Sequence, residues 1–305
     1  MAIVSFIING KLKNKEKVKL SLLNSLHALN HTSYFFETTS KENAISLVKN
    51  VLENNSDYLI TVGGDGSLNE VVNGYMKYIY PVKHKVVLGL LPAGTGNDFA
   101  KTLEIDNSIQ LLVERINKKN HVSIDVGEVK YTGLDKKVSN RFFINITDIG
   151  IGGIVSKKLS ESSRILGPDL TYIKAIIQSF LSYKPVTITL KSDVIQWKGN
   201  AMSICLANGK YFGSGMCIAP QASINDGKMQ LVILGKVSMF DYLKNLSKIK
   251  NGEIINHPEV HYASISSCEI DAKEYSCPID MDGEFIGYAP LSLIIHQKKI
   301  EFLSN

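Results

Sequence analysis

The periodicity of the apolar residues changes near residue 125, and this change constrains the fold of the 305-residue chain more than any other feature. Before it, short runs rich in Val, Ile and Leu, at residues 2–8, 58–62 and 86–91, alternate with helix-like patterns. After it, apolar and polar residues alternate strictly, as in residues 186–191. Continuous apolar runs are typical of strands buried on both faces of a parallel sheet, whereas a period of two indicates half-buried antiparallel strands.

We therefore predict an α/β chain with two domains. Residues 1–125 are expected to form a doubly wound α/β domain, because their strands and helices alternate. Residues 126–305 are expected to form a β-rich, sandwich-like domain, although the last strand can pack back on the first domain.

Composition excludes several other classes. Hydrophobic residues make up 44% of the chain, so it can bury a core and is not expected to be disordered. The net charge of +5 is too small for a nucleic-acid footprint, so no nucleic-acid partner is predicted. There is no signal-peptide pattern and no apolar stretch of the roughly 18 residues that a membrane span needs, and we expect a cytoplasmic protein. The four cysteines have no CxxC spacing and are expected to be free thiols.

A first glycine loop follows the apolar run 58–62 and precedes a helical pattern. Its residues are Gly63, Gly64, Asp65, Gly66, Ser67, Leu68, Asn69 and Glu70. A glycine turn between a strand and a helix N-terminus brings backbone N–H groups close to phosphate oxygens, and the helix dipole favours their charge. The loop lacks the Lys of a Walker A motif, and a purely structural turn explains its glycines but not its acidic and amide residues.

A second glycine loop, within residues 91–100, follows the apolar run 86–91. Its central residues are Thr95, Gly96, Asn97 and Asp98. Two such loops at the carboxyl ends of parallel strands face the same crevice of an open α/β sheet. The two loops together predict a nucleotide phosphate site.

These motifs resemble those of a known family. GGDGSLNE at residues 63–70 and LPAGTGNDFA at 91–100 are similar to the lipid kinases with a diacylglycerol kinase catalytic domain. The resemblance continues at 208–213, at 215–216, at 219–220, at Asp226-Gly227 and at residues 281–284, MDGE. In its size the chain looks most like the soluble bacterial diacylglycerol kinases.

The resemblance implies ATP and Mg²⁺ as cofactors, an ATP-binding catalytic domain over residues 1–125 and a lipid-binding domain over 126–305. Nucleotide contacts carry over to both glycine loops and to Thr39, with Thr38 as the other candidate. Of the Asn-Pro sequence with which the family usually opens, only the Asn is present, as Asn9. Residues 150–153 lack the polar residue that the family often has in the corresponding segment. A structural Mg²⁺ is implied at Asp226 with main-chain carbonyls of Ser223 and Lys228.

The general base implied by the resemblance is Asp282, with Glu284 as the close alternative and Asp65 as the next one. Taken alone, Asp282-Gly283 is a favoured hairpin-turn dipeptide, and Asn225-Asp226-Gly227 is another. Phosphoryl transfer needs positioning, charge neutralisation and an acid-base group near the acceptor hydroxyl. Because carboxylates come from both halves of the sequence, we expect the site to be assembled in a cleft between the domains.

The implied reaction is phosphorylation of diacylglycerol to phosphatidic acid. Other lipid alcohols, such as a sphingoid base or undecaprenol, remain open as acceptors, and so do an NAD-kinase-like activity and a non-catalytic binding protein. The lipid partner requires docking at the membrane surface, which Lys244, Lys248 and Lys250 can aid, although a solvated helix face is the ordinary interpretation of such lysines. The apolar stripe Ile173, Ile176, Ile177, Phe180 and Leu181 predicts a core helix more strongly than a lipid site. A homodimer is implied by the resemblance alone.

Overall fold

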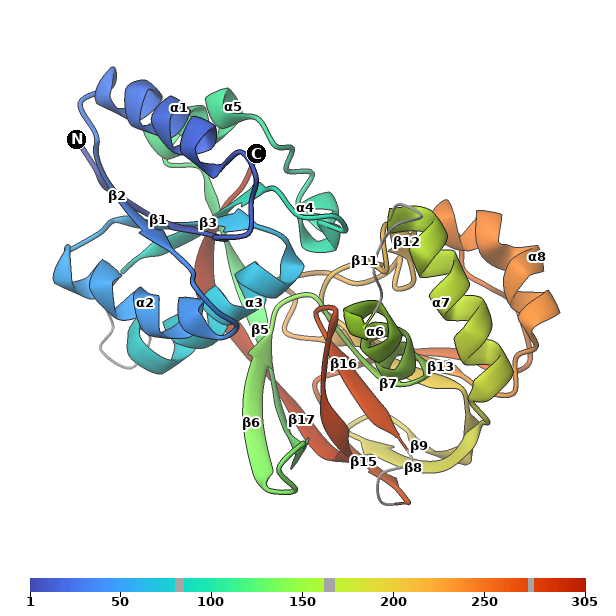
Figure 1. Ribbon diagram of the computed structural model, residues 1–305. Coiled ribbons are helices and arrows are strands. Elements are labelled where there is room, and N and C mark those ends of the chain that lie inside the picture. Colours follow the sequence, from blue (N-terminus) through green and yellow to red (C-terminus); the bar gives the residue numbers. More distant parts are fainter. Residues whose placement is uncertain (80–84, 162–167, 274–276) are drawn as a thin grey trace. The chain divides into compact units, whose positions relative to one another are not determined.

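The structure, a computed structural model, describes residues 1–79, 85–161, 168–273 and 277–305 (Figure 1). Within these ranges, the side chains of residues 52, 79, 160, 161, 168–170, 172 and 173 are not described, so Ile173 of the predicted stripe lies outside the described side chains. The chain divides into two compact units, residues 1–124 with 298–305 and residues 125–297. The short C-terminal segment therefore belongs to the first unit.

The first unit is built on a parallel sheet. Its strand order is β2 (Thr32–Glu37), β1 (Ile3–Ile8), β3 (Tyr58–Gly63), β4 (Val87–Pro92) and the end of β17 (Glu284–Leu303). Each described neighbour pair is parallel, including the pairing of β17 with β4 at Phe302 and Leu88. The inner strand β3 is buried along its whole length, as its continuous apolar run predicts.

Helices cover both faces of this sheet (Figure 1). On one face, α1 (Lys15–His27) and α5 (Ile109–Lys118) pack onto the strands through Leu22, Leu26 and Leu112. On the other face lie α2 (Asn43–Glu53) and α3 (Asp65–Gly74), which the π-turn Tyr75–Ile79 extends. The short α4 (Asp98–Thr102) follows β4. Helices on both faces of a parallel sheet confirm the predicted doubly wound arrangement.

The second unit is rich in antiparallel strands. One path runs β14 (Val260–Ile265), β13 (Met229–Leu234), β10 (Ser203–Ala207), β7 (Ile146–Gly150), β16 (Pro278–Met281) and β17. From β17 the pairing continues to β15 (Ser267–Ala272), β8 (Val186–Ser192) and β9 (Gln196–Ala201), and separately to β5 (His121–Gly133) and β6 (Val138–Phe143). Apolar side chains from both groups, such as Ile204, Leu231, Leu190 and Ile270, share one core. The β-rich, sandwich-like prediction is confirmed.

The described residues of this unit also form three helices and a short two-stranded ribbon. They are α6 (Ile151–Glu161), α7 (Pro168–Ser182), α8 (Met239–Lys250), and the ribbon of β11 (Tyr211–Phe212) with β12 (Met216–Cys217). A small apolar cluster joins the helices, with Ile176 of α7 buried in it, whereas Leu181 on the same helix is 74% exposed. The predicted stripe is therefore only partly a core face. Within the described ranges, no helix is both long and apolar enough to cross a bilayer.

Candidate active site

The two glycine loops of the first unit touch each other through their backbones. A Cβ added to Gly94 would overlap the Cα of Gly64, and one added to Gly64 would lie 3.0 Å from the Cα of Gly94. A Cβ on Gly63 would lie 2.7 Å from Ser67 Oγ. Since side chains would force these loops apart, glycine is required here for close approach. The structure thus brings together the two loops that the sequence predicted, at the carboxyl ends of β3 and β4.

The second loop is held in place by its own side chains. Asn97 adopts a left-handed conformation with φ of 50°, its Oδ1 accepts the N–H of Gly94 (3.0 Å), and its Nδ2 donates to the Gly94 carbonyl (2.9 Å). Lys101 Nζ donates to the Gly96 carbonyl (2.9 Å) and pairs with Asp98 Oδ1 (3.1 Å). Thr95 is exposed at the tip. Sequence reasoning missed Lys101, although its position three residues after Asp98 on a helix is a signal for such a pair.

Asp65 connects the two loops at the N-terminus of α3. Its Oδ1 accepts the N–H of Phe99 (3.1 Å), and a Cβ on Gly96 would lie 3.2 Å from Asp65 Oδ2 and 3.5 Å from Asp98 Oδ2. Burial raises the pKa of Asp65, and the charge of Asp98 raises it further. Two carboxylates that face one small space favour a bound cation, and a hard oxygen-ligated ion such as Mg²⁺ fits this donor set.

Asn9 and the predicted threonines lie at the carboxyl ends of β1 and β2. Asn9 Nδ2 donates to Ser67 Oγ (3.2 Å), which ties the chain after β1 to the first glycine loop. The Gly10 N–H donates to Thr38 Oγ1 (3.1 Å). Thr39 Oγ1 instead donates to Asn43 Oδ1 (3.2 Å), at the start of α2. Of the two candidates, Thr38 is the one that contacts the chain after β1.

The last three residues of the first motif are buried in the first unit. Leu68 and Asn69 have almost no exposed surface, and the Glu70 carboxylate accepts the N–H groups of Glu42 (2.8 Å) and Ala44 (3.2 Å). Glu70 therefore caps the N-terminus of α2. The part of the motif with exposed surface is residues 64–67.

In the second unit, Asp282 and Gly283 form the two-residue turn between β16 and β17, with φ of 49° and 86°. The N–H of Asp282 donates to the Ile146 carbonyl (2.9 Å), and its Oδ1 accepts the N–H of Ile146 (3.0 Å). The Asp282 side chain is therefore buried, with 4% of its surface exposed. Glu284 is paired with Arg141 (3.0 Å). The hairpin turn anticipated for this dipeptide is present, and the role of either carboxylate as a base stays a prediction.

The residues predicted to hold a structural Mg²⁺ line a polar hollow of about 280 Å³ in the second unit. Asp226 Oδ1 accepts the N–H of Lys228 (3.0 Å), and Ser223 Oγ donates to Asn225 Oδ1 (3.2 Å). The buried Asp125, which sequence reasoning missed, accepts the N–H of Gly227 (2.6 Å). Among the described residues, no group of three or more His, Cys, Asp and Glu side chains is placed to hold a metal. A metal here would depend on main-chain carbonyls.

An apolar pocket of about 130 Å³ lies in the second unit, and the motifs gave no sign of it. Its lining includes Val155 of α6, Ile176 and Phe180 of α7, and Tyr242 and Ile249 of α8. Because α8 lies more than 50 residues after α7 in the chain, packing is what brings these residues together. A pocket with this lining suits the hydrocarbon chain of a ligand.

Three carboxyl side chains line this pocket, those of Asp148, Asp241 and Glu253, and Asp148 is the buried one. Asp148 Oδ1 accepts the hydroxyl of Ser203 (2.7 Å), and its carboxylate occupies the space that a Cβ on Gly152 would need. Burial raises the pKa of Asp148 to about 7. Asp148 thus places a polar group beside residues 150–153, where the sequence lacks one.

Asp280 faces Asp148 from the next strand, since the two residues are register partners of β16 and β7. The Asp280 carboxyl accepts hydrogen bonds from Ser156 Oγ and from the N–H of Gly283 (3.1 Å). Burial raises the pKa of Asp280, and the neighbouring Asp148 raises it further. Two buried carboxyl groups this close favour a protonated form for at least one of them at neutral pH.

The fold and the paired glycine loops define a kinase of the diacylglycerol kinase type, and two family models agree. The diacylglycerol kinase catalytic domain matches residues 4–129, and the YegS C-terminal NAD kinase beta sandwich-like domain matches residues 146–303. The chain belongs to the diacylglycerol kinase catalytic-domain family.

Similar proteins extend over almost the whole chain. A diacylglycerol kinase of Staphylococcus saprophyticus is 28% identical over 97% of this chain and 93% of its own length. A diacylglycerol kinase of Staphylococcus epidermidis is 28% identical over 98% of this chain and 91% of its own.

Solved structures share the fold. A putative diacylglycerol kinase from Bacillus anthracis has a TM-score of 0.77 at 19% identity, and the match covers 100% of this chain and 98% of that one. The yeast NADH kinase complexed with NADH has a TM-score of 0.55 at 10% identity, covering 100% of this chain and 84% of that one. At these identities the likeness concerns the fold alone.

Proposed function

We propose that the protein is an ATP- and Mg²⁺-dependent lipid kinase that phosphorylates the hydroxyl group of diacylglycerol to give phosphatidic acid. The observation that carries the choice of a lipid acceptor is the apolar pocket of the second unit, in a chain whose first unit has the paired glycine loops. The named relatives support the same acceptor. A peripheral position at the cytoplasmic face of a membrane follows from such a substrate.

The first unit supplies the nucleotide site in this proposal. Backbone N–H groups of residues 64–67 and 95–97 bind phosphate oxygens, and Ser67 adds a hydroxyl group. Asp65 and Asp98 hold the Mg²⁺, which supplies charge neutralisation when it is bound. Lys101 fixes Asp98 and the Gly96 carbonyl, so the loop keeps its shape while the nucleotide binds. Asp226, with carbonyls of Ser223 and Lys228, holds a second, structural Mg²⁺.

Asp282 is the proposed general base, which accepts the proton of the acceptor hydroxyl group. Glu284 is a weaker candidate because its carboxylate is already paired with Arg141. Asp65 is the next alternative, since burial raises its pKa and a raised pKa makes a carboxylate a better base near neutral pH; as the base it would not also hold the Mg²⁺.

The pocket also helps to separate the alternatives. A nicotinamide nucleotide carries phosphates that favour cationic partners, yet none of the described residues that line the pocket is Lys or Arg. This lining favours a lipid alcohol over an NAD-kinase-like acceptor. Diacylglycerol, a sphingoid base and undecaprenol all carry hydrocarbon, so the pocket favours none of the three.

The test is phosphotransfer from γ-labelled ATP, with and without Mg²⁺, to each of diacylglycerol, sphingosine, undecaprenol and NAD, with the lipids dispersed in mixed micelles. We expect labelled phosphatidic acid, and no product without Mg²⁺. Labelling of another acceptor alone would replace the substrate. Lipid or nucleotide binding without any phosphotransfer would support a non-catalytic binding protein instead.

A further inference from the structure

Helix α8 (Met239–Lys250) has two different faces, and none of its 12 residues is buried. Tyr242, Asn245 and Ile249, spaced three and four residues apart, line the apolar pocket. This spacing places them on one side of the helix. Tyr242 also packs against Phe180 of α7, with ring centroids 5.3 Å apart, so the inner face of α8 forms part of the pocket wall.

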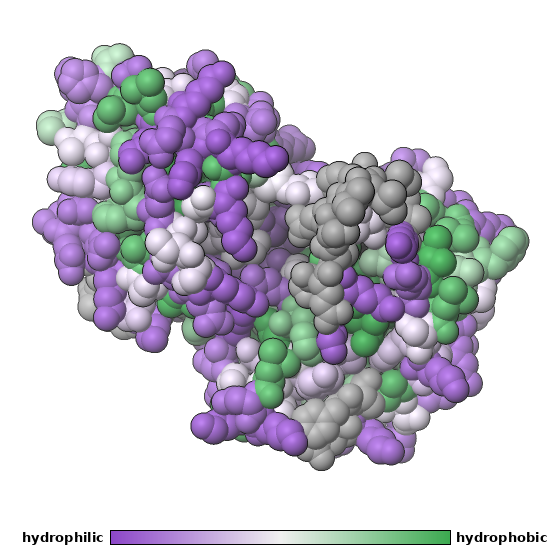
Figure 2. Space-filling view, in the orientation of Figure 1, coloured by the Kyte–Doolittle hydropathy of each residue, from purple (hydrophilic) through white to green (hydrophobic). Residues whose placement is uncertain are grey.

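The outer face of α8 carries apolar side chains in solvent. Phe240 is 75% exposed and Leu243 is 46% exposed, and Lys244 and Lys248 are exposed next to them. Leu243, Lys244 and Lys248 follow Phe240 by three, four and eight positions, so all four residues share one side of the helix. Figure 2 shows green, apolar residues at the edge of the second unit where Figure 1 places α7 and α8. We call Phe240, Leu243, Lys244 and Lys248 the outer face of α8.

Exposure to water alone does not explain why large apolar side chains and lysines share one face of α8. A large aromatic side chain exposed on a helix has a cost in water, and exposed apolar patches mark sites of interaction. The helix is nonetheless well defined, because Ser238 and Asp241 form a capping box at its N-terminus. Ile254, just after the helix, is also exposed, and its neighbour Ile255 lines the pocket. Apolar surface therefore continues from the outside of the unit toward the pocket.

Charge indicates which partner this face takes. The helix carries Lys244, Lys248 and Lys250 against a single acidic residue, Asp241, which is used in the capping box; Glu253 follows after the helix. An apolar side chain flanked by lysines on a helix that lies at a surface is the pattern of interfacial binding to anionic lipids. If the partner of this face were a second protein chain, an excess of lysines would not be needed.

We infer that the outer face of α8 docks the protein on an anionic lipid bilayer, with Phe240 and Leu243 inserted among the lipids and Lys244 and Lys248 at the head groups. The inner face of the same helix lines the proposed acceptor pocket. Docking would therefore bring the pocket close to the bilayer that contains the substrate. This inference rests on the proposed lipid kinase function, which it extends by assigning the docking surface. None of the four residues lines the pocket.

The test is co-sedimentation with vesicles, which needs no catalytic activity. Vesicles of phosphatidylcholine alone are compared with vesicles containing 30% phosphatidylglycerol, a mixture of about that composition being strongly anionic. Lys244→Gln with Lys248→Gln should weaken binding to the anionic vesicles about fivefold per lysine, and added salt should remove this difference. Phe240→Ala with Leu243→Ala should weaken binding to both vesicle types by at least about tenfold.

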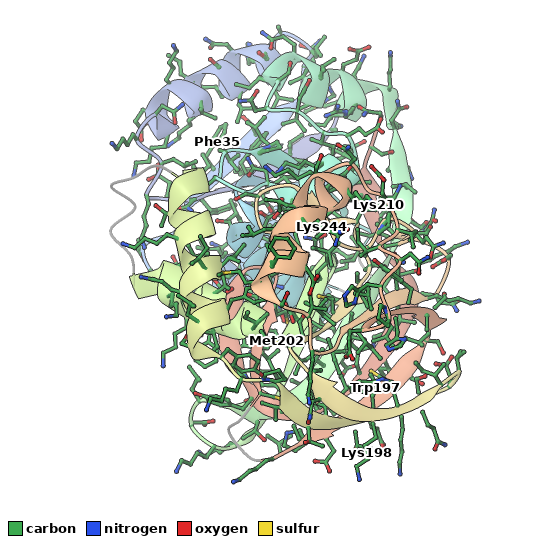
Figure 3. The ribbon with its side chains drawn as sticks, turned by 90° about the vertical axis from the view of Figure 1, so that its right-hand side faces the viewer. Phe35, Trp197, Lys198, Met202, Lys210 and Lys244 are labelled. Carbon is green, nitrogen blue, oxygen red and sulfur yellow. The ribbon has the colours of Figure 1, made fainter. Side chains whose placement is uncertain are left out.

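A matched control lies at another end of the same unit. Lys198, on β9 and far from Lys244 in Figure 3, is exposed, as are Lys191 and Val194 of the β8–β9 hairpin. Lys191→Gln with Lys198→Gln, and Val194→Ala, should leave vesicle binding unchanged. Phosphotransfer to dioctanoylglycerol dispersed in detergent should be unchanged in all these variants, which shows that they fold.

Several outcomes would overturn the inference. Binding to anionic vesicles that survives both α8 double substitutions would do so, as would an equal loss in the β8–β9 control. If Phe240→Ala with Leu243→Ala converts a dimer to a monomer in sedimentation velocity and leaves vesicle binding intact, the face contacts a second copy. Normal vesicle binding without any phosphotransfer would instead refute the proposed function and leave the docking surface in place.

Discussion

The glycine loops of the first unit and the apolar pocket of the second unit are built in opposite ways. The loops are short, contiguous segments whose glycines approach each other backbone to backbone. The pocket is made of side chains from α6, α7, α8 and four or more strands that are scattered along the chain. A phosphate-binding loop can therefore be encoded by a local motif, whereas an apolar pocket is encoded by packing.

The largest expected effect concerns the carboxylates that would carry out the chemistry. Asp282→Asn should lower kcat by about 10²- to 10⁴-fold, because it removes the proposed proton acceptor. Phosphotransfer rates are measured at saturating ATP, and nucleotide affinity by calorimetry should be unchanged.

Two matched variants sharpen this prediction. Glu284→Gln should have a smaller effect, since Glu284 is paired with Arg141. Near-normal turnover in Asp282→Asn, together with a large loss in Asp65→Asn, would move the base from the second unit to the first.

The buried Asp148 should make the second unit sensitive to pH. Its pKa is raised from 3.8 to about 7, so its contribution to folding is most favourable below pH 3.8 and is lost as the pH rises through about 7. Asp148→Asn should therefore stabilise the protein at pH 8 by at most about 4 kcal/mol, at about 1.36 kcal/mol per pKa unit, and the gain should fall toward zero near pH 4. Urea unfolding at a series of pH values measures this.

Asp193 offers a control of opposite sign. Although burial acts to raise the pKa of Asp193, hydrogen bonds from Ser266 and Ser267 hold it below its usual value. A lowered pKa contributes stability above the unfolded value, and this contribution disappears as the pH falls through the folded value. Asp193→Asn should thus destabilise the protein at pH 7 and not at pH 2. Equal pH dependence in both variants would contradict the assignment of Asp148.

A smaller effect is expected where the two glycine loops meet. Gly94→Ala should weaken nucleotide binding by about 10²-fold, because its Cβ would overlap Gly64 and displace the N–H groups of both loops. Gly96→Ala should cost less, since its Cβ would meet the movable carboxylate of Asp65 at 3.2 Å. Calorimetric titration with ATP gives both values, and equal losses would indicate that the loops are not held by backbone contact.

The smallest effect tests the pocket. Val155→Phe fills part of the space between α6 and α8 and should raise the KM for a long-chain acceptor by about tenfold, with the KM for ATP unchanged. Leu181→Phe, on an exposed position of α7, is the matched control and should change neither value. If both variants behave alike, the pocket does not hold the acceptor chain.

The sequence predicted both glycine loops, which the structure brings together, and their role as a nucleotide site stays a prediction. Asp65, Ser67, Asn97 and Asp98 were found because each lies in a motif that follows an apolar strand, and the carboxyl ends of parallel strands meet at one edge of a sheet. Leu68, Asn69 and Glu70 share the motif but are buried, which the motif alone did not separate. Lys101 was missed because its role depends on how α4 turns after the loop.

In the second unit, the local pattern correctly predicted the β-rich fold but gave little of the site. Asp148 and Asp280 are 132 positions apart and become partners only through the register of β7 and β16. Asp125 comes to lie beside Gly227 through a hydrogen bond between residues 102 positions apart. A strand pattern determines which residues face inward, but not which strands become neighbours.

The sequence by itself determined the two kinds of sheet, the two glycine loops and the family, because periodicity and contiguous motifs are local properties of a chain. Only the tertiary structure decided that Asp148 lines an apolar pocket, that Asp282 is buried in a turn against β7, and that α8 presents Phe240 to solvent while its other face lines that pocket. These depend on contacts between residues far apart in the chain, whose free energies are set by packing and burial rather than by local preference.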